Sequence, residues 1–448
     1  MTRRLLFSVV ACFTASNAVA DDVAPVAETP VAEPPAEPPV AEPLAPKAEP
    51  AEPPATATDD VDLASLVLDP SEGDNKLNIY GFTDVSWRKM LQKGSDLTSN
   101  FFPKESTFLV GNLNLYLTKN MSPRWRTLIE LRFLYAPNGT KNPDGTLTEA
   151  AAPDPADLER PISWGGISIE RAYLEYEIDP HLTIRAGAFL TPYGIWNVDH
   201  GSPTIIPVTR PFIIGENLFP DQQTGLHVYG KHPLGEYQIG YHATLSNGRG
   251  PFQGFRDLDE NKALGARLEL EAPWLDGVQL GISAYGGRFT KRPADKIITD
   301  SEGNLINSTP RGVQYDEIAW GVDALIHRGP LHVQLEVLVN DRAYLSGARD
   351  RDRVGFRPDG RYLGGYLLAG YRFNRFWQVM PFAVVEYDQP RSSADFGESP
   401  KVYQAMGGLN FRPDPSVVLK LNYAHARIFA LNSDFTIRAF MAQAAWAF

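Results

Sequence analysis

The residue pair best suited to acid–base or metal chemistry is Asp199-His200, within a long segment between two predicted strands. A histidine beside a carboxylate can belong to a catalytic or metal site. Such sites need further residues at defined spacing, and the sequence contains no G-x-S-x-G or H-E-x-x-H motif. His327 and His332 flank a tight turn on different predicted strands. We therefore expect His200 to be a hydrogen-bond partner, and the chain to have no enzymatic activity, cofactor or metal.

Many charged residues alternate with apolar ones, as in the segment WRTLIELRF at 125–133. A period of two predicts a strand with one apolar and one polar face. An arginine on the lipid face would cost about 2–4 kcal/mol at mid-bilayer, so we assign the charges to the inner face of a barrel. The strand residues predicted to line a wet pore are Arg126, Glu130, Arg132, Arg171, Glu175, Arg185, Arg267 and Lys420.

The elements that must position these residues are sixteen predicted strands. Tight turns rich in Pro, Gly, Asn and Asp alternate with long segments, which predicts short periplasmic turns and long extracellular loops. The fold class is all-β, a 16-stranded antiparallel transmembrane β-barrel. Pro381 lacks a ladder donor, so we expect a bulge or a local distortion there. The predicted strands are 77–90, 108–119, 124–136, 168–178, 181–190, 224–232, 235–246, 261–272, 277–289, 315–328, 330–344, 362–374, 376–388, 400–412, 415–428 and 435–448.

The N-terminal region differs in composition from the rest. Residues 1–20 have the basic start, apolar centre and small-residue end of a secretory signal peptide, and contain the one cysteine, Cys12. Residues 21–62 are rich in Ala, Pro and Glu, which predicts a disordered periplasmic linker. We favour a spacer, with a tether to the cell wall as the alternative. Residues 63–448 form the predicted outer-membrane barrel.

Net charge excludes one class of partner. The formal net charge is −12, and the segment 21–62 contains eleven carboxylates against one lysine. The predicted barrel is therefore near neutral and has no basic field that would favour nucleic acid. After residue 20 the chain has no apolar run of eighteen residues, so a transmembrane helix is not expected.

The chain ends with FTIRAFMAQAAWAF, an alternating strand that closes on Phe448. An exposed aromatic edge strand would favour aggregation, whereas a closed barrel has no free edge. This ending resembles the C-terminal signature of bacterial outer-membrane barrel proteins. The resemblance implies a location in the outer membrane, among outer-membrane lipid and lipopolysaccharide, and recognition of Phe448 by the barrel-assembly machinery.

The third long loop, 191–223, is rich in Pro and apolar residues, so we expect it to fold into the barrel and narrow it. Resting outside on a neighbouring subunit is the alternative. With the preceding IRAGAFLTPYGIWN, it resembles the phosphate-selective porin O and P family and related porins. The resemblance implies a trimeric anion channel lined by Arg and Lys, but acidic residues on the same strands depart from that pattern. The loop candidates are Asp199, His200, Arg210 and Glu216.

The sequence thus predicts a porin for passive diffusion of small hydrophilic solutes, which could include anions such as phosphate, with loop 191–223 as the constriction. Selection would then depend on pore size and on the charges of the lining. The alternative is a plugged outer-membrane barrel that acts as a structural tether or surface receptor.

Overall fold

The computed structural model describes most of the predicted barrel. The described residues are 76–91, 106–135, 164–198, 201–215, 218–249, 259–272, 277–291, 298–299, 305–306, 313–345, 359–375, 377–392, 401–430 and 433–448. The predicted signal peptide 1–20 and linker 21–62 lie outside the described residues. They stay predictions.

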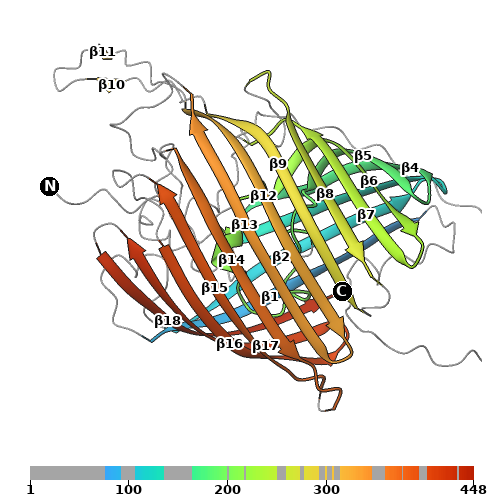
Figure 1. The fold of residues 1–448 in the computed structure, drawn as a ribbon. Helices are drawn as coiled ribbons and strands as arrows, with labels where there is room; N and C mark the ends of the chain where they lie inside the picture. The colour runs from blue at the N-terminus through green and yellow to red at the C-terminus, as the bar shows by residue number, and fades with distance from the viewer. Residues whose placement is uncertain are drawn as a thin grey trace, which may run out of the picture. The chain divides into compact units, whose positions relative to one another are not determined.

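Sixteen antiparallel strands form one closed barrel in which each strand pairs with its neighbour in sequence, and β1 pairs with β18 (Figure 1). This confirms the predicted fold class. The barrel strands are β1 (Leu77–Met90), β2 (Thr107–Asn120), β3 (Trp125–Tyr135), β4 (Trp164–Asp179), β5 (Leu182–Leu190), β6 (Gln222–Leu234), β7 (Tyr237–Ser246), β8 (Ala263–Glu271), β9 (Val278–Lys291), β12 (Val313–Arg328), β13 (Leu331–Tyr344), β14 (Gly360–Tyr371), β15 (Met380–Ser392), β16 (Lys401–Asp414), β17 (Val417–Ala430) and β18 (Ser433–Ala447).

The C-terminal strand closes the barrel through its backbone. Phe448 N–H donates to Gly81 O, and Gly81 N–H donates to Phe448 O, both at 2.9 Å. This reciprocal pair extends the β1–β18 ladder to the last residue. Because every strand edge is then paired, the backbone polar groups of the sheet are satisfied without water, as a membrane environment requires.

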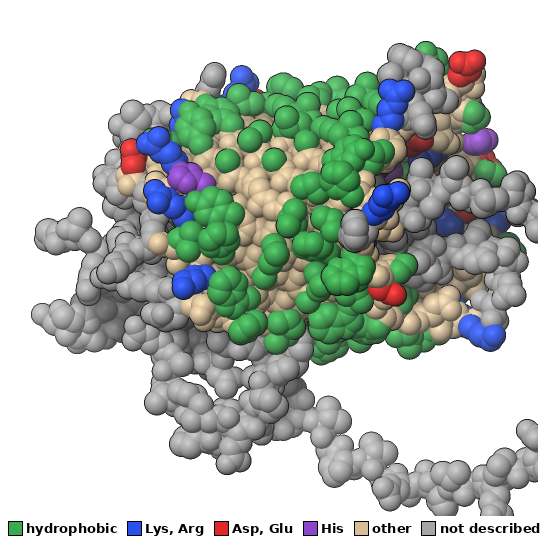
Figure 2. All heavy atoms as spheres, turned by 90° about the horizontal axis from the view of Figure 1, so that it is seen from below, with side chains coloured by type: hydrophobic (Ala, Val, Ile, Leu, Met, Phe, Trp, Pro, Cys, Tyr) green, Lys and Arg blue, Asp and Glu red, His purple; other side chains and the backbone are tan. Residues whose placement is uncertain are grey.

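The two faces of the sheet differ as the alternation predicted. Large apolar side chains are exposed on the outer face, including Leu268, Ile282 and Val385, and they form an apolar belt (Figure 2). Charged residues predicted to face inward, such as Glu130 and Lys420, are buried. An apolar exterior around a polar interior is the arrangement of an outer-membrane barrel.

Two local expectations need correction. The strand predicted to start at residue 376 starts at Met380. Its pairing with β16 includes Pro381 without a register shift, whereas its pairing with β14 ends at Phe382, so the ladder has no bulge at Pro381. The irregularity instead lies in the preceding turn, where Trp377 and Gln378 have positive φ values of 59° and 46°. An unpredicted register shift does occur between β3 and β4, beside Glu130.

Two smaller elements lie within predicted loops. The short strands β10 (Ile298–Thr299) and β11 (Leu305–Ile306) form a separate two-stranded sheet. The four-residue helix α3 (Phe212–Gly215) belongs to the loop 191–223 and contacts β14 and β15. Among the residues described, no helix has the length and apolar character needed to cross a membrane.

Candidate functional site

The loop 191–223 packs against the inner face of β13–β17, which we call the covered wall. Its apolar side chains, among them Trp196, Ile213 and Leu218, are buried in one cluster with inward-facing residues of these strands, such as Tyr366 and Met380. The high apolar content of the loop, from which the inward fold was expected, is used in this packing. Burial of a large apolar side chain contributes about 1.5–3 kcal/mol.

Carboxylates of the covered wall bind backbone amides of the loop. Glu336 Oε1 accepts from the N–H groups of Ile195 and Trp196, each at 2.9 Å, and from Tyr366 Oη at 2.9 Å. Gly194, with φ of +72°, is required beside it because a Cβ there would lie 2.4 Å from Glu336 Oε2. Glu386 accepts from Ile213 N–H at the start of α3. These bonds satisfy both the buried charges and the loop backbone.

Donors of the same wall bind backbone carbonyls of the loop. Lys420 Nζ donates to Ser202 O at 2.6 Å and to Pro207 O at 3.1 Å, and its exposed fraction is 1%. Asn410 donates to Ile206 O at 3.0 Å, and Arg412 donates to Pro203 O at 2.8 Å. Lys420 faces inward as predicted, but the loop covers it. It therefore anchors the loop instead of lining a water path.

The opposite side, which we call the charged wall, is the inner face of β3–β5. Arg185 Nη2 lies 2.7 Å from Glu175 Oε1, and Arg171 pairs with Glu130. Arg126 lies 3.6 Å from Glu175 and Arg132 lies 3.5 Å from Glu170. The predicted Arg and Glu residues of β3–β5 are thus brought together as cross-strand ion pairs. The side chains of Arg126, Arg171 and Arg185 retain exposed fractions of 36%, 19% and 17%.

Aromatic rings hold Arg185 in place. Its guanidinium carbon lies 4.1 Å from the ring centroid of Tyr173 on β4 and 5.0 Å from that of Tyr229 on β6. Tyr229 Oη also donates to Glu175 at 2.5 Å. A cation between two aromatic faces and beside a carboxylate is both desolvated and charge-compensated. The charged wall is therefore a rigid surface of paired charges.

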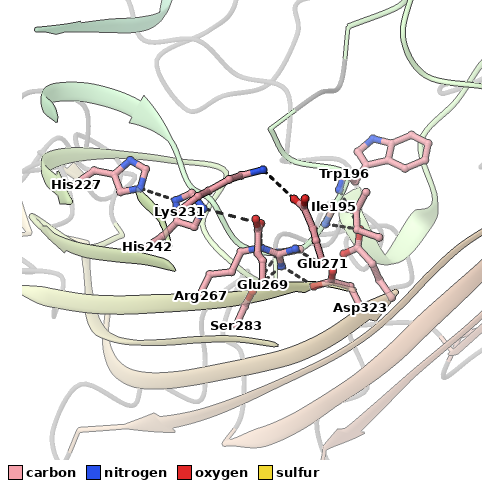
Figure 3. Close-up of polar contacts among 12 residues, drawn as sticks. Ile195, Trp196, His227, Lys231, His242, Arg267, Glu269, Glu271, Ser283 and Asp323 are labelled. Carbon is pink, nitrogen blue, oxygen red and sulfur yellow. Dashed lines mark hydrogen bonds and ion pairs between the residues drawn. The ribbon is translucent and has the colours of Figure 1, made fainter. Parts of the chain in front are cut away.

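A second polar network continues from β6 to β12 (Figure 3). Arg267 binds Asp323 through two nitrogens, one at 2.9 Å, and Glu269 at 2.6 Å. His242 Nε2 lies 3.9 Å from Glu269, and His242 Nδ1 lies 3.0 Å from His227 Nε2. Arg267 faces inward as predicted, with an exposed fraction of 3%, so it stabilises the wall more than it contacts solvent. Within the described part of the chain, no group of three or more His, Cys, Asp or Glu could hold a metal ion.

Of the four candidate residues predicted in loop 191–223, Arg210 lies among the described residues. Arg210 Nη1 lies 3.7 Å from Asp221 Oδ2, and both side chains are about one-third exposed, at 30% and 35%. Partial desolvation by the surrounding protein raises the pKa of Asp221 above its usual value, against the lowering effect of Arg210 and Arg249. Burial likewise raises the pKa of Tyr193, whose Oη lies 2.6 Å from Thr244 Oγ1. Asp199, His200 and Glu216 lie outside the described residues.

Sequence reasoning missed several interior residues. Strict alternation places Glu170 outside, but the bulge between β3 and β4 turns both Glu170 and Arg171 inward, where Glu170 meets Arg132. Glu317 on β12 was also missed. It binds Arg249 at 2.7 Å and lies 3.5 Å from Arg342. The alternating pattern of β12 could have identified Glu317, whereas no sequence signal marks the bulge.

Sequence comparison gives a match over part of the chain. No family model matches the chain. An uncharacterized protein of Aquifex aeolicus (strain VF5) is 25% identical over 289 residues, which cover 58% of this chain and 61% of that protein. The match thus spans less than two thirds of the relative's length.

Solved structures give a broader match. The in-vitro folded trimer form of OmpT, an outer-membrane protein of Vibrio cholerae, has a TM-score of 0.50 at 10% identity, covering 83% of this chain and 99% of that one. Outer-membrane expressed OmpT of the same organism has a TM-score of 0.50 at 8% identity, covering 85% and 100%. At such identity the likeness concerns the fold alone. The 16-stranded barrel and its apolar belt confirm the predicted location in a bacterial outer membrane.

Proposed function

We propose that the protein is a porin, which allows small hydrophilic solutes to diffuse passively between loop 191–223 and the charged wall. The observation that carries this proposal is the contrast between the two walls. The loop packs on one side of the interior, whereas Arg126, Arg171 and Arg185 on the other side keep part of their surface exposed to water. The loop residue pair Arg210 and Asp221 also stays partly exposed and is assigned to the constriction. Transport by this route needs no chemical step.

The charge pattern favours a weakly selective path. Phosphate and other anions would be attracted by an uncompensated row of arginines. Here Arg171 pairs with Glu130, and both Arg126 and Arg185 lie beside Glu175. Neighbouring charges of opposite sign produce a strong field close to the wall and a weak one at a distance. We therefore assign the channel to small polar solutes in general, with anions such as phosphate among them.

The assembly and partners are part of the same proposal. A homotrimer is consistent with the trimer form of the Vibrio cholerae protein that has this fold. Phe448 ends the closing strand and is 58% exposed, so it can be recognised by the barrel-assembly machinery before the β1–β18 seam forms.

The packed loop also supports the alternative of a plugged barrel that serves as a tether or receptor. Ion conduction separates the two functions. Purified, refolded protein is inserted into a planar lipid bilayer, and single-channel current is recorded in symmetric salt, followed by reversal potentials in asymmetric salt. If the protein is a porin, we expect stepwise single-channel current and a small reversal potential. Insertion without current, verified by recovery of folded protein from the membrane, would contradict the porin and favour the plugged barrel.

A further inference from the structure

The outer surface of the barrel carries a row of basic residues at its loop end. The row consists of Lys89 on β1, Arg438 on β18, Arg427 on β17 and Lys401 on β16, with His425 beside it. Lys89, Arg427 and Arg438 are exposed and Lys401 is half-buried. Figure 2 shows Lys and Arg side chains gathered at the left end of the apolar belt, around a His side chain.

Strand register places these residues side by side. His425 is opposite Arg438, and Lys89 is opposite Phe440, two residues from Arg438. On the other side, Arg427 is opposite Tyr403, two residues from Lys401. Each step therefore crosses one strand and moves two residues along it, a Cα distance of about 8 Å. Because barrel strands are tilted, such a diagonal row runs around the circumference, at a constant depth in the membrane.

Within the described part of the barrel, no carboxylate pairs with the row. Among the described residues, none of the four cations lies within ion-pair distance of a carboxylate; Arg427 and Lys401 instead lie over the rings of Phe429, Tyr387 and Tyr403, 4.9–5.5 Å from the centroids. Asp434 is exposed on the same face, opposite Phe429, and forms no ion pair with the row. Among the described residues, the row therefore has no compensating ion pair.

A comparison on the same surface shows that this is not a general property of the loop end. Arg288 on β9 binds Asp316 on β12 with two hydrogen bonds, at 2.6 and 3.2 Å. Arg361 on β14 binds Asp341 on β13 in the same way, at 2.7 and 2.9 Å. On β9–β14 the outer arginines are therefore neutralised by the chain itself. On β16–β18 and β1 no carboxylate of the described residues does so, which leaves the row available to an external anion.

We propose that this row binds the phosphate groups of a lipid in the outer leaflet, namely the phosphorylated headgroup of lipopolysaccharide. The strand ends joined by the long connecting segments are at this end, which places the row at the outer membrane–water boundary, next to aromatic rings that suit the same depth. Closely spaced Lys and Arg attract anionic headgroups, and arginine can bind phosphate bidentately. The proposal concerns the outside of the barrel and is independent of conduction.

The test measures binding of fluorescently labelled rough lipopolysaccharide to the refolded full chain in neutral detergent. We expect the variant Lys89→Gln/Lys401→Gln/Arg427→Gln/Arg438→Gln to bind at least about tenfold more weakly than the wild type. The matched control, Arg288→Gln/Arg361→Gln, removes two neutralised cations at the same end and should change affinity less than about twofold. Enzymatic dephosphorylation of the lipid should weaken wild-type binding as strongly as the four substitutions do.

Three results would overturn the proposal. These are unchanged binding by the four-residue variant, equal binding of the dephosphorylated lipid, and loss of self-association by the variant in sedimentation equilibrium, which would make the row a contact between copies of the chain. Should the variant fail to refold, a salt titration of the wild type decides the question. Binding that does not weaken at high salt would contradict a phosphate contact. Conductance should be the same in wild type and variants.

Discussion

The covered wall and the charged wall face each other across one barrel and are built from the same alternation of inward and outward residues. On the covered wall, inward charges such as Glu336 and Lys420 bind backbone groups of the loop 191–223. On the charged wall, inward charges such as Arg185 and Glu175 bind one another across neighbouring strands. The partner, not the pattern of the strand, determines whether a buried charge anchors a loop or lines a path.

This difference has an electrostatic consequence. A backbone amide or carbonyl satisfies the hydrogen-bonding atoms of Glu336 and Lys420 without supplying a charge of opposite sign. A cross-strand ion pair cancels both charges at a distance while it leaves hydrogen-bonding atoms at the surface. The first arrangement fixes the loop, and the second presents donors and acceptors to a solute.

Removal of the loop should have the largest effect. Leu190 and Gln222 are register partners at the ends of β5 and β6, so residues 193–219 can be replaced by a short Gly-Ser turn without separating the strands. We expect single-channel conductance to rise by at least about twofold, since the covered wall would then be open to water.

The matched control for this deletion removes the β10–β11 segment, residues 298–306, which lies outside the barrel sheet. Its conductance should equal that of the wild type. If the loop deletion left conductance unchanged while the barrel folded, the loop would not narrow the path.

Loss of one anchor on the covered wall should have an intermediate effect. Glu336→Ala removes the acceptor of two backbone N–H groups and of Tyr366, so we expect the free energy of unfolding to fall by about 2–5 kcal/mol. Unfolding in guanidinium, together with limited proteolysis of the loop, would measure it. Glu336→Gln keeps an acceptor oxygen and should lose much less. Equal losses in both variants would show that the charge, not the hydrogen bonds, holds the loop.

Matched removal of one positive charge from each wall compares the walls directly. Arg185→Gln leaves Glu175 with one fewer cation on the exposed surface. The reversal potential should therefore shift toward cation preference by about 10 mV. Lys420→Gln should change the reversal potential less, because the loop covers that site, but should destabilise the loop. Arg210→Ala, at the constriction, should shift preference in the same direction as Arg185→Gln. Identical shifts for Arg185→Gln and Lys420→Gln would contradict the distinction between the walls.

The sequence predicted the barrel well because strand alternation and turn residues are local. Fourteen of sixteen predicted strands agree with the structure within three residues at each end. β4 starts four residues earlier than expected, and the strand of Pro381 starts and ends four residues later. Residues 377 and 378 explain the delay, because their left-handed backbone cannot belong to a strand. The bulge that turns Glu170 inward has no such local signal.

The division between the walls could not be predicted, because it depends on contacts between distant parts of the chain. Lys420 and Arg185 have the same charge, the same inward parity and similar apolar neighbours in sequence. What separates them is the contact of Lys420 with Ser202, 218 positions away. The apolar composition of the loop predicted that it would be buried, but not which strands would bury it.

The smallest predicted effect is a pH dependence at Asp221, where the loop leaves the covered wall and joins β6. Partial desolvation raises the pKa of this carboxyl, so the folded protein binds the proton more tightly than the unfolded chain does. The resulting stability is complete below the unfolded pKa and is lost as pH rises through the folded pKa. As pH falls through the same range, Arg210 keeps its charge while Asp221 loses its own, so the reversal potential should shift slightly toward anions. Asp221→Asn should show the shifted potential already at neutral pH and lose this step on acidification; a step that persists in that variant would assign the titration to another group.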